Sequence, residues 1–293
     1  MKPAPFEYHA PDSLEQALGL MSQYAGEGKI LAGGQSLVPA MNFRVMQPGI
    51  LIDLNQVSEL SFIREEDGVI HIGAMARERH LEFDPSIAKR TPLLSEAVPF
   101  IAHPQIRNRG TIGGSIVNAD PAAELPVLMI ALDARLKAQN ASGERWINAQ
   151  DFFAGMFTTS LEADEILAEI ELPFMPPLSG WSFMEVAPRA GDYALMGVAA
   201  LIVLDENERC KQAKLVYLNA GDGPVDAKEA AKILLGEKLN NTLIESAALL
   251  ASQKEINPFG NVHTSPDFQR HLANVLTKKA LQQAILRAEE KLQ

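Results

Sequence analysis

Apolar residues along the first 175 positions recur at intervals that predict a series of short helices and strands. Asp12 or Ser13 can cap a first helix, whose apolar face is formed by Leu14, Ala17, Leu18 and Met21. Short apolar runs bounded by glycine, proline or polar residues are typical of strands, and they lie at 29–32, 50–54, 68–76 and 164–173. A helix is expected over 92–102, and a helix followed by a strand over 125–138.

A proline-rich segment, PFMPPLSG at 173–180, indicates a domain boundary. Beyond it, apolar segments joined by polar turns predict three strands, at 180–188, 194–205 and 213–221. Helical patterns follow at 226–235 and 241–252. The last helix has a clear start, because Ser265 can be its N-cap, Pro266 its first residue and Asp267 an acid in its first turn.

The whole chain is therefore expected to be an α+β protein. Its first region, 1–175, divides into α/β subdomains of about 1–55 and 56–175, and 176–293 forms a smaller α+β domain. A three-stranded antiparallel sheet with helices is expected in that second domain.

Composition narrows the possible partners and location. The formal net charge of the 293 residues is −11, which argues against nucleic acid or an anionic membrane as a partner. No apolar run reaches 18 residues, and the N-terminus lacks a signal-peptide pattern, so we expect no integral membrane segment and a cytoplasmic location. Cys210, which is expected in the polar turn DENERCKQ, is the single cysteine, which excludes a disulfide within the chain. It also excludes a four-cysteine iron–sulfur or zinc site built by this chain alone, and His263 and His271 have no companion ligands for a metal.

Two short glycine segments carry the clearest chemical signal. LAGGQSLVP (31–39) and GTIGGSIVNADPAAELP (110–126) each contain a glycine pair and a serine after apolar residues. Glycines let a ligand approach the backbone, and successive N–H groups in a turn bind phosphate oxygens. The hydroxyls of Ser36, Thr111 and Ser115 can add donors. Either segment alone can be an ordinary turn, but two in one region favour a ligand with two linked phosphates.

Standard nucleotide motifs do not account for these loops. The nearest approach to the dinucleotide pattern G-x-G-x-x-G is GEGKIL (26–31), whose glycines precede the strand instead of following it, and the P-loop pattern also fails. Two interpretations apply to the acids after the second loop. Asp120 can cap a helix with Pro121 at its first position and Glu124 completing a capping box, or Glu124 can bind ribose hydroxyls, and both can hold together.

Five segments together carry a resemblance to a known family. They are AGGQSLVP, PQIRNRGTIGGSIVNADPAAELP, DEILAEIELP, RAGDYALMGVAAL and HTSPDFQRHLANVLTKKAL. In this order they resemble the FAD-binding medium subunit of aerobic carbon monoxide dehydrogenase-type molybdenum hydroxylases, relatives of xanthine dehydrogenase. The resemblance covers essentially the whole chain. It implies an FAD-binding fold of the vanillyl-alcohol-oxidase (PCMH) type, followed by a C-terminal domain that completes the flavin pocket.

The resemblance also implies where FAD is held, without a covalent bond. The diphosphate would lie between Ala32–Ser36 and Thr111–Ser115, the adenosine ribose at Glu124, and the isoalloxazine ring under Tyr193. The implied FAD contacts are Leu31, Ala32, Gly33, Gly34, Gln35, Ser36, Leu37, Ile101, Thr111, Gly113, Gly114, Ser115, Ala119, Asp120, Ala123, Glu124, Asp164, Ile166, Leu167 and Tyr193. No catalytic side chain and no metal ligand are implied in this chain.

One position departs from the xanthine dehydrogenase-like pattern. Relatives of that branch often carry a lysine near the flavin where this chain has Glu185, which places it nearer the carbon monoxide dehydrogenase branch. His103 is interpreted as a structural or pocket residue. Arg107 and Arg109 either face a partner subunit or brace the second loop.

The resemblance implies a role in electron transfer. FAD would take electrons from the [2Fe–2S] clusters of a small subunit, which receives them from a large molybdopterin subunit, and pass them to an external acceptor. The complex would be a dimer of heterotrimers. One alternative is a self-sufficient FAD-dependent reductase resembling UDP-N-acetylenolpyruvoylglucosamine reductase, which needs a Ser or Cys proton donor and a glutamate beside the flavin. Another is a nucleotide-binding or assembly protein that holds no flavin.

Overall fold

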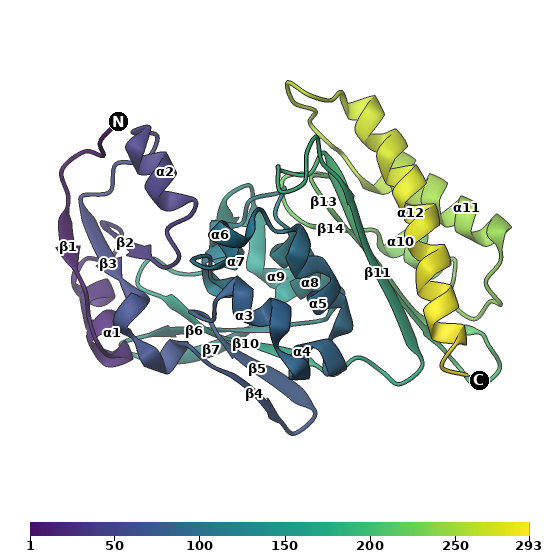
Figure 1. Cartoon of the computed structure of the whole chain (residues 1–293), viewed down its shortest axis with the longest axis horizontal. Coiled ribbons are helices and arrows are strands. Elements are labelled where there is room, and N and C mark those ends of the chain that lie inside the picture. Colours follow the sequence, from purple (N-terminus) through teal and green to yellow (C-terminus); the bar gives the residue numbers. More distant parts are fainter. Residues whose placement is uncertain (293) are drawn as a thin grey trace.

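The computed structural model describes residues 1–292 and sets three sheets side by side, with helices between them (Figure 1). The first sheet is parallel, with the order β1-β3-β2. Its elements are β1 (Glu7–His9), α1 (Leu14–Gln23), β2 (Gly28–Leu31), α2 (Leu37–Asn42) and β3 (Ile50–Asp53). Ser13, one of the two residues that the sequence offers as a cap, caps α1 by accepting a hydrogen bond from Gln16 N. Ala17, Leu18 and Met21 of α1 pack in one cluster with Ile50 and Ile52 of β3.

The second sheet is antiparallel, with the order β4-β5-β10-β6-β7. Its strands are β4 (Ile63–Glu66), β5 (Val69–Gly73), β6 (Arg135–Asn140), β7 (Gly143–Asn148) and β10 (Ile166–Pro173). The helices of this region are α3 (Glu78–Phe83), α4 (Pro85–Arg90), α5 (Pro92–Ala97), α6 (Pro104–Arg107), α7 (Ile112–Asn118), α8 (Glu124–Ala131) and α9 (Ala149–Phe152). A small hairpin of β8 (Phe153–Gly155) and β9 (Thr158–Thr159) follows α9.

The helix expected over 92–102 is shorter than its apolar pattern suggests. It ends as an α-helix at Ala97 and continues as a single 3₁₀ turn, Val98–Phe100. Pro99 lies within that turn, and a proline ring clashes with the carbonyl four residues earlier in an α-helix.

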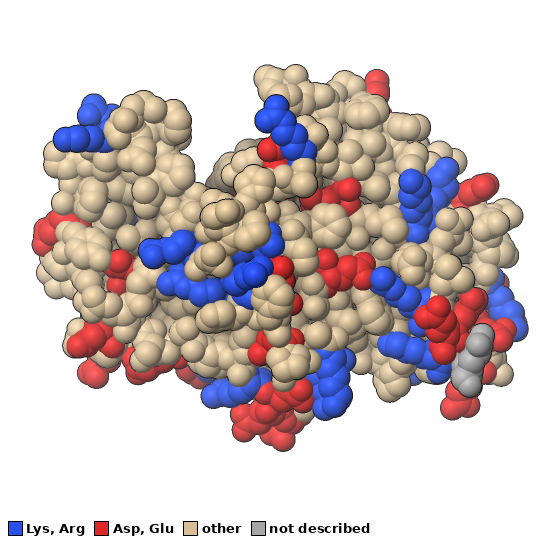
Figure 2. Space-filling model, in the orientation of Figure 1, with Lys and Arg blue, Asp and Glu red and all other residues tan. Residues whose placement is uncertain are grey.

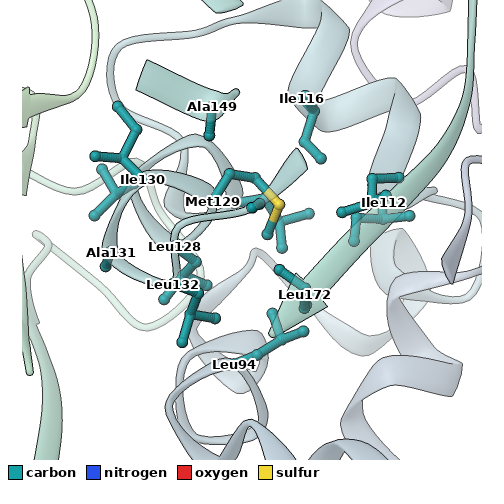
Figure 3. Close-up of a cluster of buried hydrophobic side chains, with 14 of the residues drawn as sticks. Leu94, Ile112, Ile116, Leu128, Met129, Ile130, Ala131, Leu132, Ala149 and Leu172 are labelled. Carbon is teal, nitrogen blue, oxygen red and sulfur yellow. The ribbon is translucent and has the colours of Figure 1, made fainter. Parts of the chain in front are cut away.

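One buried cluster joins the second sheet to the helices around it. Ile112 and Ile116 of α7, Met129 of α8 and Leu172 of β10 all lie in it (Figure 3). Every residue of α8 is buried. The cluster also includes Val216 and Leu218 from the third sheet, so α8 is enclosed between two sheets and cannot shift without disturbing both.

The third sheet is antiparallel and follows the segment 174–178. Its order is β11-β12-β13-β14, with β11 (Ser179–Val186), β12 (Met196–Leu204), β13 (Cys210–Leu218) and β14 (Val225–Asp226). The three long strands confirm the sequence prediction, while β14 was not predicted because two residues carry no periodic pattern. All nine residues of β12 are buried, because helices cover both faces of the sheet.

Three helices cover the outer face of the third sheet, namely α10 (Lys228–Lys232), α11 (Asn241–Leu250) and α12 (Pro266–Glu289) (Figure 1). Ser265 caps α12 by accepting from Phe268 N, and Pro266 is its first residue, as predicted. Cys210 does not lie in an exposed turn. It is the first residue of β13, is 1% exposed, and packs in the cluster beneath these helices. Within residues 1–292 no helix is long and apolar enough to span a membrane.

Glu96 of α5 fastens the third sheet to the second region. Its carboxylate accepts hydrogen bonds from Trp181 Nε1 at 3.1 Å and Phe183 N at 2.9 Å, both on β11. Arg287 of α12 donates to the same carboxylate and to Trp181 O. One side chain therefore links α5, β11 and α12.

Candidate functional site

The first glycine loop connects β2 to α2 and leaves its amides free. Within residues 1–292, the N–H groups of Gly33, Gly34, Gln35 and Ser36 donate to no protein acceptor. Gly34 has φ +73°, a conformation that glycine adopts at little cost. Gln35 Nε2 donates to Gly33 O at 3.0 Å and holds the turn. Four successive free N–H groups form a concave donor site of the kind that binds phosphate oxygens.

The second glycine segment differs from the open turn that its sequence suggests. Gly113, Gly114 and Ser115 lie within α7, and Thr111 is its N-cap. Gly113 N donates to Ala74 O at 2.9 Å, and Gly114 N donates to Thr111 Oγ1 at 3.1 Å. Ser115 N donates to Thr111 O at 3.1 Å. The backbone donors of this segment are thus engaged, so a ligand here meets close-packed backbone and hydroxyl groups instead of free amides.

The two segments meet although the contacting residues Gly33 and Gly110 lie 77 positions apart in sequence. A Cβ on Gly33 would stand 2.5 Å from Arg109 O and 2.7 Å from Gly110 Cα. A Cβ on Gly114 would stand 3.4 Å from Ala32 Cβ. The separations at Gly33 leave no space for a side chain, so glycine at this position allows the contact between the loops, whereas a Cβ on Gly114 would make an ordinary van der Waals contact with Ala32.

A cavity of about 360 Å³ opens beside the first loop. Figure 2 shows the surface hollowed beside the part of the molecule that carries α2. The lining combines the first loop with residues of α2, one exposed arginine and two polar residues at and just after the end of β3. It comprises Leu31, Ala32, Gly33, Gly34, Gln35, Val38, Pro39, Asp53, Asn55 and Arg109. Ser36 is exposed beside this cavity, and its hydroxyl makes no capping hydrogen bond within α2. Leu37 is the first residue of α2.

Two residues that the sequence analysis did not single out connect the loops. Asn55 follows β3 and donates from Nδ2 to Ala32 O at 2.9 Å. Arg77 precedes α3, donates from Nη2 to Asn55 Oδ1 at 2.6 Å, and donates from Nη1 to Arg109 O. Both are polar residues shortly after the end of a strand, which is a weak sequence signal for a site residue. Their spacing in the sequence matches no known motif, so the sequence does not show that they contact each other.

The acids after the second loop do not form the predicted capping box. The next helix, α8, begins at Glu124 with Ala123 as its N-cap residue, and no side chain caps it. Asp120 instead closes a turn, in which Oδ1 accepts from Ala122 N at 2.9 Å. Ala119, in a left-handed conformation, ends α7 and turns the chain into this segment. The capping interpretation is therefore wrong, because the left-handed residue delays the new helix by three positions.

The buried side chains of Glu78 and Glu124 and the half-buried side chain of Glu185, on β11, form an acidic group in which Glu124 interacts with the other two. Burial is the first cause that raises their pKa values, to about 8 for Glu78, about 7 for Glu124 and about 8 for Glu185. Negative charge on Glu124 raises the pKa values of the other two further. Glu78 Oε2 and Glu185 Oε2 have no hydrogen-bond partner within residues 1–292. At neutral pH Glu78 and Glu185 are therefore mostly protonated and Glu124 is divided between its two forms, unlike ordinary glutamates.

Tyr193 lies in the loop between β11 and β12 and is 71% exposed. Partial loss of water around the phenol, and then the charges of Asp120 and Glu124, raise its pKa. The loop therefore approaches the end of α7. His103 supports this arrangement, because a Cβ on Gly191 would stand 2.5 Å from the His103 ring. The structural interpretation of His103 agrees with this packing.

Arg107 and Arg109 have different roles. Arg107 is 5% exposed and donates from Nη1 to Ile101 O at 2.8 Å and Ala102 O at 3.0 Å. Arg107 Nε also donates to Glu82 at 3.0 Å, so Arg107 braces the chain before the second loop, one of the two roles considered for it. Arg109 is exposed and faces the cavity. Figure 2 shows basic side chains gathered over α3 and α6, around this junction.

The remaining predicted contact residues lie on β10 and just before it. Ile166 and Leu167 are both 3% exposed and point into different clusters, so any ligand can meet only their backbone. The neighbouring strand β5 pairs with β10 from Glu169 onward, and Ala74 N donates to Ala168 O at 3.0 Å, so that Ile166 and Leu167 lie outside this pairing. Asp164 precedes β10 and is half-buried.

Cys210 cannot supply a proton at the glycine loops. It lies in the cluster beneath α10, α11 and α12, and burial raises the pKa of its thiol to about 11. Over residues 1–292 no group of three or more His, Cys, Asp or Glu side chains is arranged to hold a metal ion.

Two family models match this chain. Residues 4–175 match the FAD binding domain in molybdopterin dehydrogenase, and residues 181–284 match the CO dehydrogenase flavoprotein C-terminal domain. The chain is 42% identical to the 6-hydroxypseudooxynicotine dehydrogenase complex subunit alpha of Paenarthrobacter nicotinovorans, over 98% of this chain and 97% of that one. It is 35% identical to the carbon monoxide dehydrogenase medium chain of Hydrogenophaga pseudoflava, over 97% and 98% of the two chains.

Solved structures share the whole fold. A chain of carbon monoxide dehydrogenase from Hydrogenophaga pseudoflava, in a form that lacks the Mo-pyranopterin moiety, superposes with a TM-score of 0.95 at 36% identity, over 98% of this chain and 99% of that chain. A chain of quinoline 2-oxidoreductase from Pseudomonas putida 86 gives 0.93 at 35% identity, over 98% and 99%.

Proposed function

The chain belongs to the FAD-binding medium subunits of molybdenum hydroxylases of the carbon monoxide dehydrogenase type, and from this premise we propose that it is the electron-transfer subunit of such an oxidoreductase. It would receive electrons from the [2Fe–2S] clusters of a small subunit and pass them to an external acceptor. When bound, FAD supplies the redox chemistry, because it takes up and releases two electrons one at a time. The protein holds the ring, sets its potential and exposes one edge of it.

The contact between the two glycine segments is the observation that carries this proposal. The free amides of Gly33–Ser36 are donors for phosphate oxygens, and Thr111–Ser115 packs against the same loop. Two closely packed backbone segments, with glycine at positions 33 and 114 where a Cβ would meet neighbouring atoms, fit an extended dinucleotide such as FAD. We place the diphosphate there, the adenosine ribose at Glu124 and the ring beside Tyr193, and these residue assignments are part of the proposal.

Partner subunits complete the proposed electron path. Relatives are named as the subunit alpha of a dehydrogenase complex and as the medium chain of carbon monoxide dehydrogenase. The one cysteine of this chain is buried in a core, so [2Fe–2S] clusters with their cysteine ligands must lie on another chain. We propose a small iron–sulfur subunit, a large molybdopterin subunit and a dimer of heterotrimers. A cytoplasmic location and division into domains 1–175 and 176–293 belong to the same proposal.

Absorbance spectroscopy tests the electron-transfer role. The purified chain is loaded with FAD and mixed, without oxygen, with the small and large subunits, which have been reduced with dithionite and freed of excess reductant. We expect the flavin absorbance to bleach with the reduced partners and to stay unchanged with oxidised ones. Bleaching by NADPH with the chain alone, followed by reoxidation with an enol substrate, would instead support a self-sufficient reductase. A chain that takes up no flavin would contradict both.

A further inference from the structure

A single side chain spans the junction between the two glycine loops. Arg77 lies just before α3, and its backbone forms an isolated antiparallel bridge with Thr111. On either side of it, Ile112 N donates to Ala76 O at 3.1 Å and Glu78 N donates to Gly110 O at 3.1 Å. The main chain of Arg77 is therefore fixed to the second loop. Its guanidinium is free to reach the first.

The guanidinium joins the two loops through one intermediary. Arg77 Nη1 donates to Arg109 O, directly before the second loop, while Nη2 donates to Asn55 Oδ1 at 2.6 Å. Asn55 Nδ2 then donates to Ala32 O at 2.9 Å, at the start of the first loop. The planar guanidinium has two parallel donor groups in a fixed geometry, so it holds these acceptors at a defined separation.

Asn55, the intermediary, is itself held in place by hydrogen bonds to the first sheet. Asp53 Oδ1 accepts from Asn55 N at 2.9 Å, and Tyr8 donates from its hydroxyl to Asp53 Oδ2 at 2.6 Å. The hydrogen bond from Tyr8 to Asp53 is the first cause of the raised pKa of that tyrosine. This chain of contacts runs from β1 through β3 to the second loop, so it crosses between the two α/β regions. Asn55 Nδ2 also donates to Asp53 Oδ1, so the side-chain amide cannot turn away without breaking three contacts.

The two glycine segments approach each other through their backbones at Gly33 and Gly110. A Cβ on Gly33 would stand 2.5 Å from Arg109 O and 2.7 Å from Gly110 Cα, so even a methyl group would not fit there. A site binds a diphosphate more tightly when its donor groups are already held in place. Any loop that must become ordered on binding costs free energy and weakens the affinity. We propose that Arg77, acting through Asn55, is the positioning residue that fixes the separation of the two glycine loops and so preorganises the diphosphate site for FAD.

The charge of Arg77 also fits this role. Burial and the nearby charge of Arg109 lower the pKa of Arg77, so two guanidinium groups lie close together at the junction. In a chain with a formal net charge of −11, this local concentration of positive charge favours an anion at the loops. The role of Arg77 rests on the proposed placement of the diphosphate, so the experiments below test the two separately.

The test measures the dissociation constant of FAD from the full-length chain by flavin fluorescence, together with thermal unfolding with and without FAD. Arg77→Met and Asn55→Leu should each weaken FAD binding by about 10-fold to 100-fold, the range for losing hydrogen bonds to a charged group. Arg77→Lys keeps the positive charge but lacks the two parallel N–H donors of the guanidinium, so it should also lose most of the affinity for FAD. The double variant should bind no more weakly than the poorer single variant, because both act through one chain of contacts.

Arg209→Met is the matched control. Arg209 also sits in an isolated bridge, with Lys238, and donates to a backbone carbonyl, Gly236 O at 2.8 Å, but it lies in the C-terminal part of the chain. It should leave FAD binding unchanged. An Arg77→Met variant whose unfolding temperature falls while FAD raises it by the same increment as in the wild type would overturn the positioning role. Wild-type affinity in Arg77→Lys would overturn the geometric argument.

Gly34→Val separates the two levels of the inference. If Gly34→Val loses FAD while Arg77→Met keeps wild-type affinity, the loops hold the diphosphate and the Arg77 assignment is wrong. If Gly34→Val keeps wild-type affinity, the placement of the diphosphate is wrong, and the proposal for Arg77 fails with it.

Discussion

The carboxyl group of Glu78 packs directly against the α-carbon of Gly110, on the buried side of the second glycine loop. A Cβ on Gly110 would stand 2.6 Å from Glu78 Cδ, and Glu78 N donates to Gly110 O at 3.1 Å. Glu78 is 4% exposed, so its carboxyl group has no room to withdraw into water. The absence of a side chain at Gly110 thus leaves space for the buried carboxyl group of Glu78. Substitution of either residue should therefore disturb the second loop.

Adding one methyl group at Gly110 should destabilise the fold. We expect Gly110→Ala to lower the free energy of unfolding by about 1–3 kcal/mol, because the buried carboxyl must be displaced within a packed site. Urea denaturation measures the change. Gly19→Ala is the control, since a Cβ there meets open space on α1 and alanine favours helix, so that variant should be neutral or slightly stabilised. Equal stability of Gly110→Ala and wild type would show that Glu78 has space to move.

Glu78 should make stability decrease as pH rises. Burial raises its pKa to about 8 in the folded chain, with Glu124 raising it further and Arg107 lowering it. The folded chain therefore binds this proton more tightly than the unfolded chain, and the stabilisation is complete below the ordinary glutamate pKa and lost as pH rises through about 8. Glu78→Gln should remove a slope approaching about 1.4 kcal/mol per pH unit between pH 5 and 8.

Urea denaturation of Glu78→Gln and wild type across this pH range measures the difference in slope. Glu124 and Glu185 also have raised pKa values, so the variant should keep part of the wild-type pH dependence. Parallel stability curves for the two proteins would contradict the buried, protonated state of Glu78.

The sequence predicted best those features that depend on residues close to one another along the chain. Glycine pairs, caps and periodic apolar faces marked both loops, α1 and α12, and the structure places each there. Whether a glycine segment is an open turn or the start of a helix depends on distant partners. Gly113 N bonds to Ala74 O on another segment, and this fixed α7 where the sequence predicted a loop.

Tertiary contacts also explain what sequence reasoning missed. Arg77 and Asn55 lie 22 positions apart and meet only because β3 and the end of β5 lie near one another in the fold. Cys210 stands among charged neighbours in sequence, yet its register on β13 turns it into the core. Polar context alone could not distinguish a turn from the first residue of a buried strand.

Bulky residues in the glycine loops should prevent FAD retention. Valine at position 34 must adopt φ +73°, which costs about 1–2 kcal/mol for a residue with a Cβ, and would crowd Leu31 and Val38. Valine at position 114 would press on Thr111 Oγ1 and Ala32. We expect Gly34→Val and Gly114→Val to purify without flavin, as absorbance spectra would show. Gly49→Val, where a Cβ meets open space, should keep it, and normal flavin content in both loop variants would refute the assignment.

The link through Glu96 should contribute strongly to stability. Glu96→Ala leaves the indole N–H of Trp181 and the guanidinium of Arg287 without their carboxylate, so we expect a loss of about 2–3 kcal/mol in the free energy of unfolding. Glu96→Gln, which keeps an acceptor but no charge, should lose less. Differential scanning calorimetry measures both. If Glu96→Ala unfolded at the wild-type temperature, the carboxylate would not be holding α5 to β11 and α12.

Tyr193 offers a direct test of where the flavin ring lies. An aromatic side chain 71% exposed in a loop near Asp120 and Glu124 has no core to stabilise, so its ring is available to stack on a ligand. Tyr193→Ala should weaken FAD binding by about threefold to tenfold and relieve quenching of flavin fluorescence, while Tyr193→Phe, which keeps the ring, should bind as the wild type does. Phe268→Ala, an exposed aromatic at the start of α12, serves as the control and should change neither quantity. Because the stacking energy depends on the ring and not on the hydroxyl, equal losses in Tyr193→Ala and Tyr193→Phe would point to a hydrogen bond from the phenol, and unchanged fluorescence in Tyr193→Ala would place the ring elsewhere.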